Sequence, residues 1–130
     1  MAKQTITEAE FFVMQVLWDA KKPLSSAEVL SRLPEKEWKY TTVSTLLTRL
    51  SEKGAVSFEK KGRLYFYQPI IEEGSYKMRQ TRRFLSHIYN GSVGSLVATL
   101  FQNNALSEQE RKELREILDA EDKPGGPNHV

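Results

Sequence analysis

Short hydroxyl side chains and one arginine dominate one arc of residues 40–54. The arc consists of Thr41, Thr42, Ser44, Thr45, Thr48, Arg49 and Glu52. Hydroxyl and guanidinium groups donate hydrogen bonds to phosphate oxygens and to base edges, and a threonine methyl can lie against the methyl group of thymine. Residues of these types therefore suit a surface that approaches a DNA duplex closely.

The same segment has the hydrophobic spacing of an amphipathic helix that ends at Gly54. Its apolar stripe, at i, i+3, i+4 and i+7, consists of Val43, Leu46, Leu47 and Leu50. A solvent-facing arc usually carries lysine, glutamate and glutamine, whereas β-branched threonine is a mediocre helix former. Contact with a partner therefore explains the threonine-rich arc better than solubility does. The alternative is a solvated helix that is rich in threonine.

Ser/Thr-x-x-Glu capping boxes predict two helices before this segment, at residues 7–20 and 25–33. Phe11 and Trp18 form a second apolar edge on the first of them, which predicts that it is buried on two sides. Three helices in this order indicate that residues 40–54 form the third helix of a helix-turn-helix unit.

After residue 54 the hydrophobic period changes to two. The alternation sets Val56, Phe58, Leu64 and Phe66 against Ser57, Glu59, Tyr65 and Tyr67. Two such runs around the turn at residues 60–63 predict a β-hairpin. Three helices followed by a hairpin predict a winged helix-turn-helix DNA-binding domain over residues 1–71, with the third helix as the reader and the hairpin as the wing. On the wing, Lys60, Lys61 and Arg63 are expected to contact phosphate, whereas Tyr65 and Tyr67 are more typical of packing residues.

Beyond Pro69 the helical period returns, and three more helices are predicted over residues 72–120. Three helices of modest length form too thin a set to bury both apolar faces of the fifth helix, which favours two-fold pairing of this region. The alternative is a monomer in which the region folds back on the winged helix. The predicted dimer interface consists of Phe84, Leu85, Ile88, Val93, Leu96, Val97, Leu100, Phe101, Leu114, Ile117 and Leu118. Residues 121–130 are predicted to form a disordered tail.

Charge is divided unevenly along the chain, although the net charge is only +2. Residues 39–63 hold six basic and two acidic side chains, a local charge of +4. Residues 107–122 hold three basic and seven acidic side chains, a local charge of −4. The division suggests two surfaces with different roles, the alternative being chance clustering.

One arginine of the third helix and one basic cluster of the fourth helix each have two possible roles. Arg49 is expected to contact DNA, and its alternative is an ion pair with Glu52 or Glu59. A basic cluster in the fourth helix could extend the phosphate footprint or pair across a dimer with the acidic sixth helix. That cluster consists of Lys77, Arg79, Arg82 and Arg83.

Composition excludes several classes of protein. The chain has no cysteine, so disulfides and thiolate metal sites are excluded, and His87 and His129 are too far apart to form a ligand motif. No phosphate-binding glycine-rich loop or catalytic triad is recognisable, so neither an enzyme nor a cofactor or metal site is predicted. No segment has the length and apolar character of a membrane span or a signal peptide, which favours a cytoplasmic protein without membrane insertion.

Four motifs carry a family resemblance over about residues 5–120. They are Glu10-x-x-Val13-Met14-x-x-Leu17-Trp18, then Tyr40-Thr41-Thr42-Val43-x-Thr45-Leu46-Leu47-x-Arg49-Leu50-x-x-Lys53-Gly54, then Gly62-Arg63-x-Tyr65-x-Tyr67, and lastly Tyr89-x-Gly91 with Ser95-Leu96-Val97. In these motifs the chain resembles the BlaI/MecI/CopY family of bacterial transcriptional repressors.

The resemblance implies a homodimeric repressor that binds an inverted-repeat operator with TACA/TGTA half-sites upstream of β-lactam-resistance-type genes. It places Thr41, Thr42, Ser44 and Thr45 near the bases of the major groove. Thr48 and Arg49 would make backbone or base contacts further along. In the BlaI and MecI branch, a BlaR/MecR-type membrane sensor protease relieves repression by cleaving the repressor in the fifth helix.

Two departures from the family pattern affect induction. The scissile bond of the BlaI and MecI branch is Asn-Phe, whereas the aligned pair here is Thr99-Leu100, so cleavage in this region would require a sensor of different specificity. The copper-responsive branch uses cysteine pairs, and a chain without cysteine cannot form that Cu(I) switch. A competing functional class is a winged-helix module that binds only another protein through its threonine face.

Overall fold

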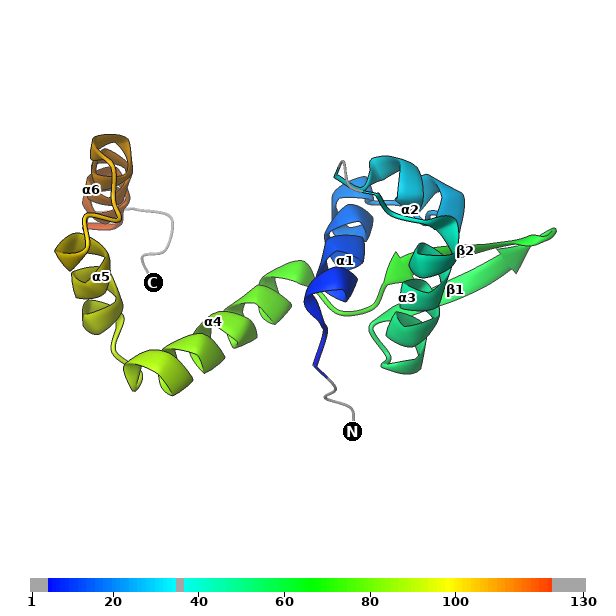
Figure 1. Ribbon diagram of the computed structural model, residues 1–130, viewed down its shortest axis with the longest axis horizontal. Helices are drawn as coiled ribbons and strands as arrows, with labels where there is room; N and C mark the ends of the chain where they lie inside the picture. Colours follow the sequence, from blue (N-terminus) through cyan, green and yellow to red (C-terminus); the bar gives the residue numbers. More distant parts are fainter. Residues whose placement is uncertain (1–4, 35–36, 123–130) are drawn as a thin grey trace. The chain divides into compact units, whose positions relative to one another are not determined.

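A computed structural model of the 130-residue chain describes residues 5–34 and 37–122 (Figure 1). In chain order its elements are α1 (Glu8–Ala20), α2 (Ser26–Arg32), α3 (Tyr40–Glu52), β1 (Val56–Lys61), β2 (Leu64–Pro69), α4 (Glu73–Tyr89), α5 (Val93–Gln102) and α6 (Glu108–Asp122). This order confirms the predicted fold class, a mainly helical chain with a small β-hairpin wing. Among the described helices, none is both long and apolar enough to cross a membrane.

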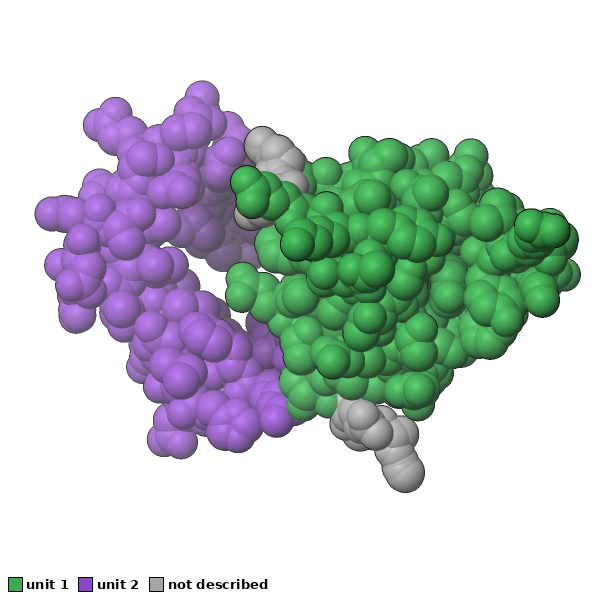
Figure 2. Space-filling model, turned by 45° about the vertical axis from the view of Figure 1, so that its right-hand side comes forward, with its two compact units in different colours: residues 1–78 green, residues 79–130 purple. Residues whose placement is uncertain are grey.

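The chain divides into two compact units, residues 1–78 and 79–130 (Figure 2). The division falls inside α4. The sequence placed a domain boundary earlier, after residue 71. The first turn of α4 belongs to unit 1 because Tyr76 is buried, with its ring centroid 6.1 Å from that of Phe11 and 5.9 Å from that of Trp18. The indole nitrogen of Trp18 also donates a 3.0 Å hydrogen bond to the carbonyl oxygen of Ile71. The second apolar edge of α1 therefore holds the start of α4.

Unit 1 has a closed hydrophobic core between its helices and its hairpin. The apolar stripe predicted for α3 is buried in full, at Val43, Leu46, Leu47 and Leu50. It packs among fully buried side chains of the other elements, which include Val13, Met14, Leu17, Leu24, Val29 and Val56. Because its inner face is fixed in this way, α3 turns its hydroxyl-rich arc away from the core.

The predicted starts of α1 and α2 and the predicted end of α3 are confirmed by their geometry, whereas the turn predicted at residues 60–63 is shorter, because β1 runs to Lys61 and β2 begins at Leu64. Thr7 and Glu10 form a capping box at the start of α1, and Ser25 and Glu28 form one at the start of α2. Gly54, just after α3, has a φ of 79°, a left-handed conformation that glycine adopts without strain. These local signals set the starts of α1 and α2 and the point after α3 where the chain turns into the wing.

The two strands of the wing pair antiparallel, with Lys61 opposite Leu64 across a two-residue turn. This register places the even-numbered residues of β1 on the same face as the odd-numbered residues of β2, so Phe58 lies opposite Tyr67. The alternation in the sequence had grouped Val56 and Phe58 with Leu64 and Phe66, and that grouping is wrong. A residue from before α2 joins the sheet, since Leu24 exchanges two backbone hydrogen bonds with Tyr67, of 2.8 and 2.9 Å.

Unit 2 contains the rest of α4 and the helices α5 and α6. A third capping box, Ser107 with Glu110, opens α6 as predicted. Within the described residues, α5 and α6 contain no buried side chain. Residues 121 and 122, which the sequence assigned to a tail, complete α6, and the remainder of that predicted tail, residues 123–130, lies outside the described residues.

Candidate nucleic-acid interface

The outer arc of α3 is accessible in the folded chain. Thr41, Thr42, Thr45, Thr48 and Arg49 are exposed, while Ser44 is half-buried. Four of the exposed residues line one open hollow whose floor is the buried Leu46, namely Thr41, Thr42, Thr45 and Arg49. The fold therefore brings most of the predicted reading residues onto one surface.

The side chains of this surface differ in what they can still donate. The hydroxyl of Thr48 donates a 3.0 Å hydrogen bond to the carbonyl oxygen of Ser44, so its proton is used within the helix. Across residues 5–34 and 37–122, the hydroxyls of Thr41, Thr42 and Thr45 have no hydrogen-bond partner, and Arg49 is in no ion pair. Three hydroxyl donors and one guanidinium are thus available to a ligand. The alternative pairing of Arg49 with an acidic neighbour is not formed.

A buried ion pair fixes the end of α3 against the start of α1. The ammonium of Lys53 lies 2.6 Å from Oε1 of Glu10 and donates a second hydrogen bond, of 2.8 Å, to the carbonyl oxygen of Thr5. Glu10 is 1% exposed, and its Oε1 also accepts from the backbone N–H of Thr7. Lys53 is therefore a positioning residue for α3, and its charge is neutralised inside unit 1.

The ion pair has a clear effect on the pKa of Glu10. Burial alone acts to raise this pKa, but the hydrogen bonds from Lys53 and from the backbone of Thr7, together with the charge of Lys53, outweigh burial and lower it. Glu10 therefore stays ionised in the folded chain. Sequence reasoning found the capping role of Glu10 but missed this pairing, because the two partners are 43 residues apart.

The wing carries its positive charges on both faces. Lys60, Lys61 and Arg63 are all exposed around the turn at Gly62. The Lys60 ammonium lies 5.8 Å from the ring centroid of Tyr65, and the Lys61 ammonium lies 5.9 Å from that of Phe66 on the opposite face. An aromatic face attracts a cation at such distances and holds it near the surface. The three predicted phosphate contacts therefore remain accessible.

The basic cluster of α4 is divided by the unit boundary. Lys77, in unit 1, pairs with Glu73 at 2.8 Å, and Glu73 also accepts a hydrogen bond from Gln15. The predicted members in unit 2, at positions 79, 82 and 83, are all exposed. Lys77 is thus already engaged within its own helix.

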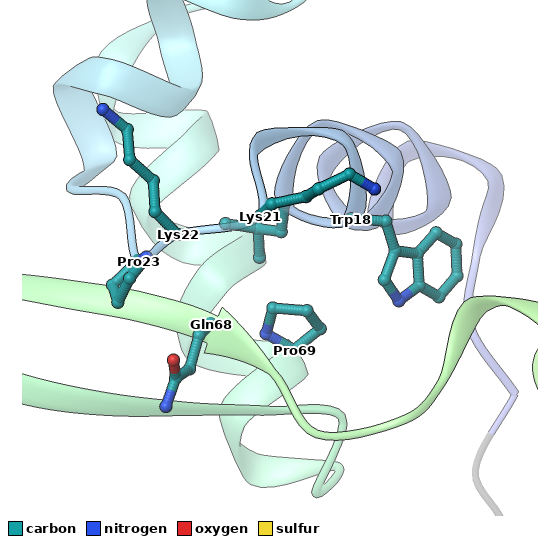
Figure 3. A pocket seen from close by; sticks show the side chains of 7 residues that line it. Trp18, Lys21, Lys22, Pro23, Gln68 and Pro69 are labelled. Carbon is teal, nitrogen blue, oxygen red and sulfur yellow. The ribbon is translucent and has the colours of Figure 1, made fainter.

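A second concave region, at the end of α1 opposite β2, has a volume of about 300 Å³ (Figure 3). Its wall includes the rings of Trp18, Pro23 and Pro69, and its two lysines, Lys21 and Lys22, extend in different directions. The polar groups do not converge on one point, as they would in a small-molecule site. No group of three or more potential metal ligands occurs among the described residues.

The apolar residues predicted for the dimer interface are incompletely covered in the single chain. Leu85, Leu96, Val97, Leu100 and Leu114 are half-buried. The exposed members are Phe84 at 47%, Ile88 at 61%, Val93 at 59%, Phe101 at 43%, Ile117 at 59% and Leu118 at 62%. Thr99 and Leu100, the aligned cleavage pair, lie within α5, where the hydroxyl of Thr99 bonds the carbonyl oxygen of Ser95.

Comparison with known proteins assigns the chain to a family. A family model described as Penicillinase repressor matches residues 6–120. The chain is 36% identical over 115 residues to the penicillinase repressor of Bacillus licheniformis, with 88% of this chain and 89% of the relative covered. It is 33% identical over 114 residues to the methicillin resistance regulatory protein MecI of Staphylococcus aureus strain N315, with 87% and 92% covered.

A solved structure agrees with these relatives. The solution structure of the DNA-binding domain of the repressor BlaI matches with a TM-score of 0.50 and 37% identity, over 58% of this chain and 94% of that domain. The relatives are named as repressors and not as enzymes, which confirms the sequence-based prediction of a DNA-binding regulator. The resemblance stated from the four motifs is likewise confirmed. The chain belongs to the penicillinase repressor family.

Proposed function

We propose that this repressor acts in the cytoplasm as a homodimer on an inverted-repeat operator of the TACA/TGTA type. The observation that carries the proposal is the outer face of α3, where three unpartnered threonine hydroxyls and Arg49 lie together. Such groups match base edges and phosphates in a major groove. Occupation of a promoter dyad would repress transcription by blocking polymerase.

The roles within the interface follow from side-chain chemistry. Thr41, Thr42 and Thr45 would read bases together with the half-buried Ser44. Thr48 and Arg49 would contact bases or the backbone further along the groove. The wing residues Lys60, Lys61 and Arg63 would neutralise phosphates without reading sequence, so they would set affinity and its salt dependence.

The homodimer is supported by the exposed apolar side chains of unit 2. A soluble chain rarely leaves several large apolar residues uncovered on neighbouring helices, and such surfaces mark interaction sites. A second copy would cover them and would place two winged-helix heads on the two half-sites of a dyad. The α4 arginines then either meet DNA phosphates or pair with acids of α6 in the other copy.

For regulation, we propose genes of the β-lactam-resistance type, on the basis of the names of the relatives. We also propose that a BlaR/MecR-type membrane sensor protease ends repression by cutting near Thr99 and Leu100. Incubation with a candidate sensor, followed by mass mapping of fragments, tests this step. Intact chain after incubation with an activated sensor would contradict it.

Binding of the purified protein to a TACA/TGTA dyad and to a scrambled duplex of equal length tests the proposed function. We expect tighter binding to the dyad, and for both duplexes a steep loss of affinity as salt rises, because phosphate contacts release counterions. Equal affinity for both duplexes, or no binding to either, would favour the competing class, a winged-helix module that binds only protein.

Two substitutions separate the proposed roles. Thr45→Ala should cost about 1–2 kcal/mol on the dyad and relax sequence preference, since it removes a base contact. Lys61→Ala should weaken binding to both duplexes equally and reduce the slope of log affinity against log salt by about one. If Thr45→Ala behaves like Lys61→Ala, the division into reading and anchoring residues is wrong.

A further inference from the structure

Aromatic rings continue from the core of unit 1 onto an exposed face of the wing. On this face Tyr67 is buried, while Phe58 is 50% and Tyr65 is 45% exposed. The ring centroid of Phe58 lies 5.1 Å from that of Tyr65 and 5.8 Å from that of Tyr67. Because the rings pack on one another, the phenol of Tyr65 is held in place at the surface.

Tyr40 supplies a second phenol from the first residue of α3, and it is 51% exposed. The pKa of Tyr67 is raised chiefly by burial and further by Tyr65 and Tyr40, so Tyr67 lies near each of the other two phenols. In the part of the chain that the structure describes, the hydroxyls of Tyr40 and Tyr65 have no hydrogen-bond partner. Two accessible O–H donors are therefore available, one at the start of α3 and one on β2 of the hairpin.

The charge around these phenols is positive. Lys60 is the cross-strand partner of Tyr65, and its ammonium lies 5.8 Å from the Tyr65 ring centroid. No acidic residue shares this face of the hairpin, because the register directs Glu59 to the opposite face. Neutral hydroxyl donors beside an ammonium are the groups that proteins use to hold phosphate oxygens. The base-reading arc of α3 begins at the next residue, Thr41.

We propose that Tyr40 and Tyr65, together with Lys60, clasp one sugar–phosphate strand of DNA where it passes between α3 and the wing. The clasp rests on the proposed function, since it requires α3 to lie in a groove. It adds two neutral backbone contacts to the charged ones and fixes the register of α3 on the duplex. A strand of phosphates is the occupant because the clasp combines hydroxyl groups that can donate with the cation of Lys60, and the hairpin places no acid on this face.

Tyr40→Phe and Tyr65→Phe test the clasp in the full-length protein, because each removes a hydroxyl and keeps its ring. Affinity is measured for the TACA/TGTA dyad and the scrambled duplex over a salt series. Each variant should bind both duplexes about 3- to 10-fold more weakly, the effect of one lost hydrogen bond. Its salt slope should not change, since a neutral hydroxyl releases no counterion, whereas Lys60→Gln should lower the slope by about one. Tyr67→Phe, which removes the hydroxyl of the buried residue in the same ring cluster, is the matched control and should bind normally.

Duplexes with a neutral methylphosphonate at one position locate the contact. Neutralising the clasped phosphate should weaken the wild type and leave the corresponding Tyr→Phe variant unaffected. Wild-type affinity of both Phe variants would overturn the clasp and leave the repressor function in place. Weaker binding to the dyad alone, or an altered oligomeric state, would also overturn it, since the phenols would then read bases or bind a second copy. Failure of the wild type to prefer the dyad would remove the proposed function, and the clasp with it.

Discussion

Unit 1 buries its apolar side chains within the chain, whereas the helices of unit 2 leave many of theirs exposed. In unit 1, Leu17 and Leu47 have no exposed surface. In unit 2, Ile117 is 59% and Leu118 is 62% exposed, although with Leu114 they repeat the i, i+3, i+4 part of the apolar spacing of α3. The difference teaches that one sequence pattern can serve two purposes. Unit 1 uses it to close a core, whereas in unit 2 it stays exposed in the single chain, where the proposed second copy would cover it.

The same contrast holds for charge. Unit 1 contains a buried ion pair, Glu10 with Lys53, which joins α1 to the end of α3. The charged residues of α6 are instead largely exposed, and Arg111 lies 5.6 Å from the ring centroid of Phe101 at the surface. A head with a closed core, and a region that the proposed second copy would complete, are what a dimeric DNA reader requires. Substitutions in the two units should therefore differ in their dependence on protein concentration.

Leu100→Glu in α5 should have the largest effect. A carboxylate at a half-buried position of the proposed interface is costly to desolvate, so we expect the dimer to dissociate. Loss of the second head should weaken binding to the dyad on the order of 100-fold, because the two half-sites are no longer engaged together. Sedimentation velocity and fluorescence anisotropy measure the two effects, and circular dichroism checks that unit 1 stays folded.

Gln102→Glu is the matched control for this substitution. It places the same charge on α5 at an exposed polar position, so it should leave both the oligomer and the affinity unchanged. An unaltered dimer in Leu100→Glu would contradict the assignment of α5 to the interface. It would favour the monomer in which unit 2 folds back on the winged helix.

The sequence predicted what local patterns control. Capping residues located the starts of α1, α2 and α6, and the apolar stripe of α3 identified its buried face, because both depend on residues only three or four positions apart. Strand pairing was misread, since the faces of the wing depend on the turn register that sets Phe58 opposite Tyr67.

Within the candidate site, residue types identified the exposed arc of α3 but could not separate free groups from engaged ones. Thr48 appears equivalent to Thr45 in the sequence, yet only Thr48 donates its proton to a backbone carbonyl. Lys53 appears equivalent to the wing lysines, yet it is paired with a buried carboxylate. The first distinction is set by the side-chain conformation within α3 and the second by a tertiary contact, and residue type shows neither.

Lys53→Met should have the next largest effect. It should lower the stability of unit 1 and leave association of the chains unchanged. The substitution leaves the Glu10 carboxylate buried with only its bond from Thr7, so the free energy of unfolding should fall by about 2 kcal/mol. Both tryptophans of the chain lie in unit 1, so tryptophan fluorescence during urea unfolding reports this loss. The loss should not change with protein concentration, in contrast to the effect of Leu100→Glu.

The pH dependence of the free energy of unfolding should test the same role of the Glu10–Lys53 pair. The pKa of Glu10 is lowered in the folded chain, so its pairing stabilises fully above the pKa of an unfolded glutamate, about 4.3, and the stabilisation is lost as the pH falls through the lowered value. Lys53→Met should reduce this acid-dependent loss, because the hydrogen bond and the charge of Lys53 no longer oppose burial and only the bonds from Thr7 still lower the pKa of Glu10. Lys77→Met, which removes the exposed pair with Glu73, should scarcely shift the urea midpoint. If the free energy of unfolding depended on pH in the same way for wild type and Lys53→Met, the stabilising role of the Glu10–Lys53 pair would be contradicted.

The smallest effects should come from one motif present in both units. Thr7→Ala and Ser107→Ala each remove the hydroxyl of a capping box, and each should cost about 1 kcal/mol of helix stability. The cost of Thr7→Ala should appear in the tryptophan-detected unfolding of unit 1 at every protein concentration, because α1 packs in a closed core. The cost of Ser107→Ala should instead appear as a weaker dimer, because in the proposed dimer α6 would gain its remaining packing from the second copy. Equilibrium sedimentation of the two variants separates the outcomes. If Ser107→Ala leaves the dimer unchanged while Thr7→Ala weakens it, the proposed contrast is wrong. In that contrast unit 1 folds by itself and unit 2 is completed by a second copy.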